Sequence, residues 1–181
     1  MGTYVVLLRG VMPYGRNKVP MATLRTILSE AGLGNVQTYI QTGNVIAESE
    51  LNRADIETLV RDAVRERIGA PVSAIARTAD QFRVIFEHNP FTDVDRSRVY
   101  FSLLHEYPSR ERREKFLLTD FSPDAVKLID DALYTLYNTK HSDSRFTNNF
   151  FERQLKVSST SRNFNTMKKL VELSSAQQVG D

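Results

Sequence analysis

The sequence contains no cysteine, and this absence excludes disulfides, thiolate nucleophiles and cysteine-rich zinc sites together. Histidine is also scarce, with three in 181 residues. No His-Glu-x-x-His spacing is present, so we expect no protein-built metal site. His141, Ser142 and Asp143 are adjacent in the chain, but adjacent side chains need not converge into a triad. The sequence therefore identifies no nucleophile with a paired base, no metal and no cofactor.

Long apolar runs are missing as well. No stretch approaches the roughly 18 apolar residues that cross a bilayer. The first residues lack the basic leader and small-residue cleavage site of a secretory signal, and they are typical of a first strand. The composition, 41% apolar and 25% charged, is ordinary for a soluble globular protein of one or two domains. We therefore expect a cytoplasmic protein that makes no contact with a membrane.

The first half of the chain has the hydrophobic patterns of a β-α-β-β-α-β unit. The continuous apolar run 5–8 predicts a strand that is buried on both faces. A helical pattern follows and stops at Gly32, and alternating residues on both sides of Thr42-Gly43 predict a hairpin. Asn52 is an N-cap signal for the next helix, and 72–77 is the fourth strand. This order is the split βαβ, or ferredoxin-like, unit.

The second half repeats much of this order after a bridging helix that Pro90 stops. A strand at 99–104, a hairpin that turns at Asp130-Asp131 and a helix over 145–155 are predicted, while the signal for a fourth strand near Val157 is brief. We therefore predict an α+β fold with two ferredoxin-like (split βαβ) units in tandem, the second incomplete or altered, plus a C-terminal helix. The predicted domains are 1–90, with the bridging helix, and 91–181, with the C-terminal helix.

Positive charge is concentrated in two segments that the net charge of +2 conceals. Residues 1–29 contain four basic residues and no acidic one, and residues 140–169 contain seven basic and two acidic residues. Residues 30–139, in contrast, contain 13 basic and 18 acidic residues. Segregated charge predicts a basic surface that meets an anion, because local potential depends on where charges lie.

The loop over residues 10–18 is the first candidate anion site. It follows a strand and precedes a helix, where backbone amides and basic side chains suit a phosphate or a carboxylate. Its glycine spacing matches neither phosphate-binding fingerprint, and the alternative is a solvated loop. The candidate ligand-binding residues in this region are Arg9, Arg16, Asn17 and Lys18.

Two carboxamides, Gln41 and Asn44, flank the predicted turn at Thr42-Gly43 and are further candidates. We expect this turn at the end of the sheet opposite the loop 10–18, so the two carboxamides need not meet that loop. The alternative role is turn chemistry, since glycine supplies a positive φ and asparagine tolerates one.

Two later segments, 140–145 and 160–163, each lead into a predicted helix. Capping explains their hydroxyl groups, but Arg145 and Arg162 then lie at the helix end where a cation is unfavourable. We interpret this mismatch as an indication that an anion binds. The candidates here are Ser144, Arg145, Arg162 and Asn163, and our hypothesis is that the basic segments share one pocket.

Four segments of the chain resemble a bacterial family catalogued as domain of unknown function 1697. They are Leu8-Arg9-Gly10-Val11 with Gly15 to Met21, Thr38 to Val45, Asn89-Pro90-Phe91, and Thr160 to Thr166. The resemblance covers nearly the whole chain and implies an α/β fold with ferredoxin-like parts, but it brings no established activity. Met12-Pro13-Tyr14 replaces the Asn-Val-Gly of the family, which removes an amide and a glycine from the loop.

Three functions fit these observations. The first is binding of a phosphate-bearing anion: a nucleotide, a nucleic acid or a phosphorylated metabolite. The second is an enzyme that acts on such a ligand, with Gln41, Asn44 and Asn163 orienting it; it ranks lower because no general base is evident. The third is an interaction or structural protein whose basic loops are only solvated. An RNA-recognition module is not favoured, because residues 45–48 lack the aromatic side chains that stack bases in such modules.

Overall fold

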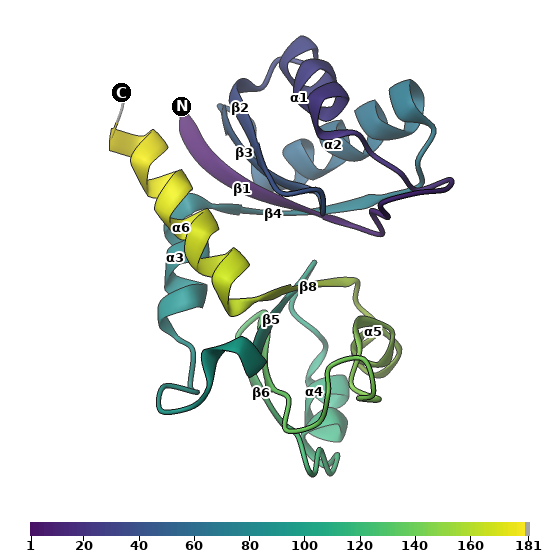
Figure 1. Ribbon diagram of the computed structural model, residues 1–181, viewed down its shortest axis with the longest axis vertical. Helices are drawn as coiled ribbons and strands as arrows, with labels where there is room; N and C mark the ends of the chain where they lie inside the picture. Colours follow the sequence, from purple (N-terminus) through teal and green to yellow (C-terminus); the bar gives the residue numbers. More distant parts are fainter. Residues whose placement is uncertain (180–181) are drawn as a thin grey trace. The chain divides into compact units, whose positions relative to one another are not determined.

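The computed structural model describes residues 1–179 and contains two compact units (Figure 1). Unit 1 comprises residues 1–84 and the C-terminal segment from Lys169, and unit 2 comprises residues 85–168. Each unit is built on a four-stranded antiparallel sheet. The α+β class and the tandem ferredoxin-like units are confirmed. The predicted domains, 1–90 and 91–181, stay a prediction, and their last two residues lie outside the described part.

Unit 1 has the strand order β2-β3-β1-β4, in which every neighbouring pair is antiparallel. The chain leaves it through α3 (Ala79–Glu87). Its elements are β1 (Gly2–Arg9), α1 (Met21–Glu30), β2 (Gly34–Tyr39), β3 (Asn44–Ser49), α2 (Arg53–Ile68) and β4 (Ser73–Thr78).

The core of unit 1 lies between the sheet and its two helices. Val6 and Leu8 of β1 pack in one cluster with Leu24 of α1 and Val60 of α2. The alternate residues of β1, such as Leu7, are also fully buried. The prediction that this strand is buried on both faces is therefore confirmed, and neither face of β1 offers an open platform.

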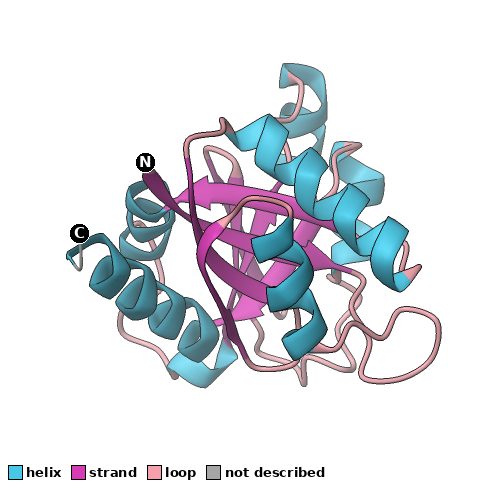
Figure 2. Cartoon of the chain, turned by 90° about the horizontal axis from the view of Figure 1, so that it is seen from above, coloured by secondary structure: helices cyan, strands magenta, loops and turns pink. Residues whose placement is uncertain are grey.

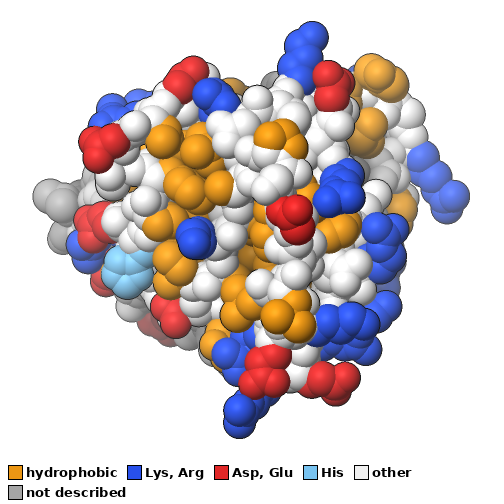
Figure 3. Space-filling view, turned by 90° about the horizontal axis from the view of Figure 1, so that it is seen from below, with side chains coloured by type: hydrophobic (Ala, Val, Ile, Leu, Met, Phe, Trp, Pro, Cys, Tyr) orange, Lys and Arg blue, Asp and Glu red, His pale blue; other side chains and the backbone are white. Residues whose placement is uncertain are grey.

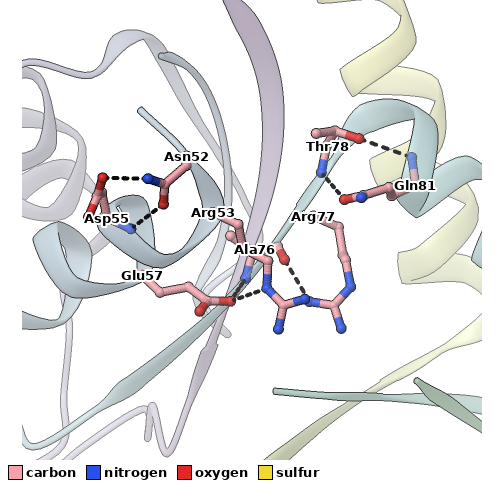
Figure 4. Close-up of polar contacts among 8 residues, drawn as sticks. All are labelled: Asn52, Arg53, Asp55, Glu57, Ala76, Arg77, Thr78 and Gln81. Atoms are coloured by element: carbon pink, nitrogen blue, oxygen red, sulfur yellow. Dashed lines mark hydrogen bonds and ion pairs between the residues drawn. The ribbon is translucent and has the colours of Figure 1, made fainter. Parts of the chain in front are cut away.

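Local signals set the ends of the helices in unit 1 (Figure 4). The side chain of Asn52 accepts a hydrogen bond from the Asp55 amide at 3.0 Å, which confirms the predicted N-cap of α2. The side chain of Thr78 and the amide of Gln81 form the matching contact at the start of α3, at 3.2 Å. Gly69, with φ of +79°, ends α2 in the left-handed conformation that glycine adopts easily.

Unit 2 repeats the topology of unit 1, with strand order β6-β7-β5-β8. In each unit two helices pack against the sheet. Figure 2 draws the helices in cyan and the strands in magenta. The elements of the second half are the 3-10 helix η1 (Arg96–Arg98), β5 (Val99–Leu104), α4 (Arg110–Leu117), β6 (Ala125–Ile129), β7 (Ala132–Leu136), α5 (Asn148–Leu155), β8 (Ser159–Asn163) and α6 (Phe164–Val179). The alteration in this unit lies in its helices, because α4 and α5 have only eight residues each.

Strand β8 is the fourth strand that the sequence left uncertain. Its side chains are polar, and hydrogen bonds hold them in place of apolar contacts. The hydroxyls of Ser159 and Ser161 both donate to the Asn148 side-chain oxygen, at 3.0 and 2.8 Å. A second bond joins Ser161 to Ser102 of β5. The segment therefore lacks the apolar alternation that identifies most strands in a sequence.

In each unit, a carboxylate from the second helix accepts a hydrogen bond from a backbone amide of one edge strand, β4 or β8. In unit 1, Glu57 of α2 accepts a hydrogen bond from the Ala76 amide of β4 at 2.8 Å (Figure 4). In unit 2, Glu152 of α5 accepts from the Ser159 amide of β8, also at 2.8 Å. An unpaired edge amide is a template for unwanted strand pairing, and both units satisfy it from the second helix.

Candidate ligand-binding loops

The β1–α1 loop has a fixed backbone that its own hydrogen bonds define. The Asn17 side chain donates to the Gly10 carbonyl oxygen at 3.0 Å, and the Met12 amide donates to the Asn17 carbonyl oxygen at the same distance. The Lys18 amide donates to the Gly15 carbonyl oxygen at 3.1 Å, which closes the tip. The loop extends beyond the end of the sheet of unit 1 (Figure 1).

The side chains at this tip point to solvent. Tyr14 is 75% exposed and Met12 is 49% exposed. Arg16 and Lys18 are exposed too, and no carboxylate within residues 1–179 forms an ion pair with either of them. The loop therefore offers two cations and one aromatic ring on a backbone that is already ordered.

The turn between β2 and β3 lies beside this loop, so the prediction that it lies at the opposite end of the sheet is wrong. The Leu8 amide donates to the Gly43 carbonyl oxygen at 2.8 Å, and Asn44 pairs with Leu7. The physical reason is the topology: β3 is antiparallel to β1, so the start of β3 meets the end of β1.

The structure separates candidates that hold the backbone from those that face outward. The Asn44 side chain is buried and donates to the Tyr39 carbonyl oxygen at 3.0 Å and to the Thr42 hydroxyl at 2.9 Å. Asn17 is likewise engaged with Gly10. Gln41 is exposed on the turn, and Arg9 is half-buried at the end of β1. Both asparagines thus shape the loops, while Gln41 faces solvent with the cations.

In unit 2 the predicted helix over 145–155 begins only at Asn148, and its N-cap is Thr147. Ser144 is therefore not a cap. Its buried hydroxyl donates to the Asp124 carboxylate at 2.8 Å and accepts from the Phe146 amide at 3.1 Å. Arg145 is exposed in the preceding loop, where it donates to the Asp120 carbonyl oxygen at 3.2 Å and lies over the Phe146 ring.

Asp124 organises the loop that contains these candidates. Its carboxylate accepts hydrogen bonds from the amides of Asn138 and Thr139, at 2.7 and 2.9 Å, and from the hydroxyls of Thr139 and Ser144. Burial acts to raise the pKa of this carboxyl, but the hydrogen bonds from Thr139, Ser144 and Asn138 together outweigh burial and lower it. The loop is thus held around an ionised carboxylate, which sequence patterns did not reveal.

Arg162 directly precedes Asn163, the N-cap of α6, so its segment leads into a helix. It is a residue of β8, paired with Phe101, and its guanidinium donates to the Thr160 hydroxyl and the Ser161 carbonyl oxygen, both at 2.8 Å. Asn163 caps α6 by accepting from the Thr166 amide at 2.9 Å. These bonds hold the guanidinium beside β8, and an anion at Arg162 stays a prediction. The shared pocket for the two basic segments stays a prediction.

The sequence also missed the packing of His141, which lies in an aromatic group. Its ring stacks on Tyr100 with centroids 4.4 Å apart and meets the edge of Tyr137 at 4.8 Å. Burial lowers the pKa of His141, so the neutral imidazole is favoured near pH 7.

Within residues 1–179 there is neither a metal-binding cluster nor a helix that could cross a membrane. No group of three or more His, Cys, Asp or Glu side chains in this part of the chain is placed to hold a metal ion. No helix among these residues is both long and apolar enough to cross a membrane. On the face drawn in Figure 3, hydrophobic side chains occupy the centre, and several Lys and Arg side chains gather along the right side.

Comparison with known proteins gives a family and a fold. A family model described as "Protein of unknown function (DUF1697)" matches residues 1–134. None of the curated proteins is significantly similar to the chain. A solved structure, the conserved bacterial protein SP0830 from Streptococcus pneumoniae, is similar with a TM-score of 0.75 at 20% identity, over 97% of this chain and 99% of that one. That likeness extends to the fold alone. Because the family model spans well over half of the sequence, the chain belongs to the DUF1697 family of proteins of unknown function.

Proposed function

We propose that the protein binds a phosphate-bearing ligand through the β1–α1 loop of unit 1. The observation that carries this proposal is the pair Arg16 and Lys18, exposed on a loop whose backbone Asn17 fixes. They lie in a segment, residues 1–29, that contains no acidic residue. An ordered loop loses little conformational entropy when it binds, so its cations are well prepared for an anion.

Among phosphate ligands, a single-stranded nucleic acid fits this loop best. The loop is open, and an open surface suits a ligand that contacts protein along its backbone. Tyr14 stands 75% exposed close to the two cations, and base stacking on such a ring complements phosphate contacts. Bases cannot instead stack on β1, because Val5 and Leu7 on the face away from the helices are buried.

Binding is favoured over catalysis by what the candidate side chains do. Asn44 and Asn163, which an enzyme would use to orient a substrate, are engaged in shaping a turn and capping a helix. His141 packs in an aromatic group. A cytoplasmic location, where such ligands are abundant, is part of this proposal.

The test is the salt dependence of binding to a fluorescein-labelled oligothymidylate, followed by fluorescence anisotropy. Each phosphate contact contributes about 0.7 to the slope of log affinity against log salt for a single strand. The variant Arg16→Gln/Lys18→Gln should therefore bind more weakly and lower the slope by roughly 1.4. The matched control is Lys115→Gln/Lys127→Gln, which removes the same charge from exposed positions in unit 2.

Three results would overturn the proposal. The first is no binding of the oligonucleotide at low salt together with no rise in melting temperature from free nucleotides or sugar phosphates. The second is equal loss in the two double variants, which would make the attraction a property of total charge. The third is a loss of folding in Arg16→Gln/Lys18→Gln, since surface ligands should change the unfolding free energy by less than about 0.5 kcal/mol. If only free nucleotides or sugar phosphates raise the melting temperature, the ligand is a small phosphate at the same loop.

A further inference from the structure

Unit 2 contains a pocket of about 290 Å³ where α3 ends and α6 begins. The segment that runs from the end of α3 to Arg96, the first residue of η1, completes its wall. Its volume is close to the lower limit of small-molecule pockets, roughly 300 Å³. It lies apart from the residues of the β1–α1 loop in sequence, and the proposed phosphate site makes no use of it.

The walls of this pocket are largely aromatic. Phe86, Phe91 and Phe164 line it, and the rings of Phe86 and Phe164 lie 5.1 Å apart at 50°. Phe86 also stacks on Phe101, which is fully buried in the sheet of unit 2, at 5.7 Å. The aromatic wall is therefore anchored to the core, and it keeps its shape without a ligand.

Two cations border the aromatic wall. The Arg96 guanidinium lies over the Phe164 ring, 5.3 Å from its centroid. Lys168 lines the same pocket one helical turn after Phe164 on α6. Glu87 is a lining residue too, so the charged groups of the pocket sum to a single positive charge at neutral pH.

The segment that carries Phe91 and Arg96 is held by short-range hydrogen bonds. Asn89 accepts from the Phe91 amide and donates to the Phe91 carbonyl oxygen, both at 3.1 Å. The Asp95 carboxylate accepts from the amide and hydroxyl of Ser97, at 3.0 and 2.7 Å, and so caps η1. These bonds preform the wall, in which the Arg96 guanidinium faces the Phe164 ring.

Two of the segments that resemble the family meet at this pocket. Asn89 and Phe91 belong to the first, and Phe164 belongs to the second. Neither segment contributes to the phosphate-binding loop. Their meeting at one aromatic and basic cavity gives both a chemical role that the sequence did not assign.

We propose that this pocket binds a small aromatic carboxylate, with its ring between Phe91 and Phe164 and its carboxylate on Arg96 and Lys168. The flat rings suit a planar ligand, and a guanidinium binds a carboxylate with two parallel hydrogen bonds. This site is independent of the phosphate-binding loop, so either proposal can fail without the other.

The probe is 2-naphthoate, with 2-naphthamide as the uncharged ligand of the same shape and butyrate as the anion without a ring. Binding is measured by calorimetry and by the shifts of backbone amide signals in the wild-type protein. We expect 2-naphthoate to bind more tightly than both comparison ligands. The amide signals of Phe91, Thr92 and Lys168 should move most, and this readout does not depend on any variant folding.

Variants then assign the two parts of the ligand. Arg96→Gln and Lys168→Gln should each weaken 2-naphthoate by roughly threefold to fivefold, the effect of an exposed ion pair, and should not change 2-naphthamide. Phe91→Leu should weaken both ligands alike. Arg16→Gln/Lys18→Gln is the control and should bind 2-naphthoate as the wild type does.

The proposal is overturned if 2-naphthamide binds as well as 2-naphthoate, because the cations then make no contribution. It is overturned as well if the shifted amide signals lie outside the pocket, or if 2-naphthoate produces no shift at all. Equal binding of butyrate would show that the aromatic wall contributes nothing and would have the same consequence.

Discussion

The Leu8 amide donates a hydrogen bond to the Gly43 carbonyl oxygen, and the two atoms are 2.8 Å apart. This bond joins the end of β1 to the turn between β2 and β3. The loop that follows β1 and the turn are therefore neighbours. Arg16 and Lys18 are exposed on the loop, and Gln41 is exposed on the turn. Because the two segments are neighbours, the proposed binding surface includes the turn as well as the loop.

Replacing Gly43 by alanine should destabilise unit 1. Gly43 has φ of +75°, and a Cβ there would lie 2.7 Å from the Leu8 Cβ and 2.9 Å from a Val11 methyl carbon. Strain and overpacking together should lower the unfolding free energy by about 2–4 kcal/mol. Urea unfolding followed by circular dichroism measures the change.

Gly15→Ala is the matched control for Gly43→Ala. Its φ is +78°, but a Cβ there meets no atom within 4 Å. Gly15→Ala should therefore lower the unfolding free energy through backbone strain alone, by about 1 kcal/mol. Equal losses in the two variants would contradict the close approach of Gly43 to Leu8 and Val11.

The sequence predicts the helices and strands that are buried through apolar side chains. The run 5–8 predicted a strand buried on both faces, and the structure confirms it because Val6 and Leu7 point to opposite faces and both are buried. It did not locate β8, because Ser159 and Ser161 are held through Asn148 by hydrogen bonds. Periodicity measures hydrophobicity, and it has no signal for a strand that polar bonds stabilise.

The candidate site was harder to predict than the fold, since side-chain partners come from distant parts of the chain. The sequence indicates a helix cap at Ser144, but its partner is Asp124, 20 residues away. Arg162 leads into α6 as the sequence predicts, but the sequence does not reveal that it also belongs to β8 and bonds to Thr160 and Ser161. The exposure of loop cations such as Arg16 is easier to predict, because charged side chains on loops are usually solvated.

Removing the Glu57 side chain should destabilise edge strand β4. Glu57→Ala takes away the acceptor of the Ala76 amide at 2.8 Å and of Arg53 at 3.1 Å. A buried amide without its acceptor costs about 1–3 kcal/mol. Glu66→Ala, an exposed position on the same helix, should have almost no effect. Urea unfolding gives both values, and hydrogen exchange at Ala76 should accelerate only in Glu57→Ala.

Asp124 should make the stability of unit 2 depend on acid pH. Hydrogen bonds hold the pKa of its carboxyl below the usual value, so the folded state binds a proton less readily than the unfolded state. The resulting stabilisation is complete above the unfolded pKa, about 3.9, and is lost as the pH falls through the folded pKa. Asp124→Asn should therefore be less stable at pH 7, by about 1–3 kcal/mol, and closer to the wild type at pH 3.

The control for Asp124→Asn is Asp143→Asn, in an exposed position of the following loop where the carboxylate accepts only from Ser142. It should leave the pH profile of urea unfolding unchanged. A gap between wild type and Asp124→Asn that is the same at pH 3 and pH 7 would contradict the role of the ionised carboxylate.

Gln177 of α6 should stabilise unit 1 through its hydrogen bond to a buried carboxylate of β3. Glu48 of β3 is 2% exposed and accepts from the Asn35 side chain at 2.7 Å and from the Gln177 side chain at 3.0 Å. Gln177→Ala removes one donor from a buried charge, and we expect a loss of about 1–3 kcal/mol in urea unfolding. The neighbouring Gln178 is exposed, so Gln178→Ala should be neutral. Because the helix end is tied to unit 1 by this contact, hydrogen exchange in the last turns of α6 should quicken in Gln177→Ala. Equal exchange in the two variants would mean that other contacts of α6 hold it.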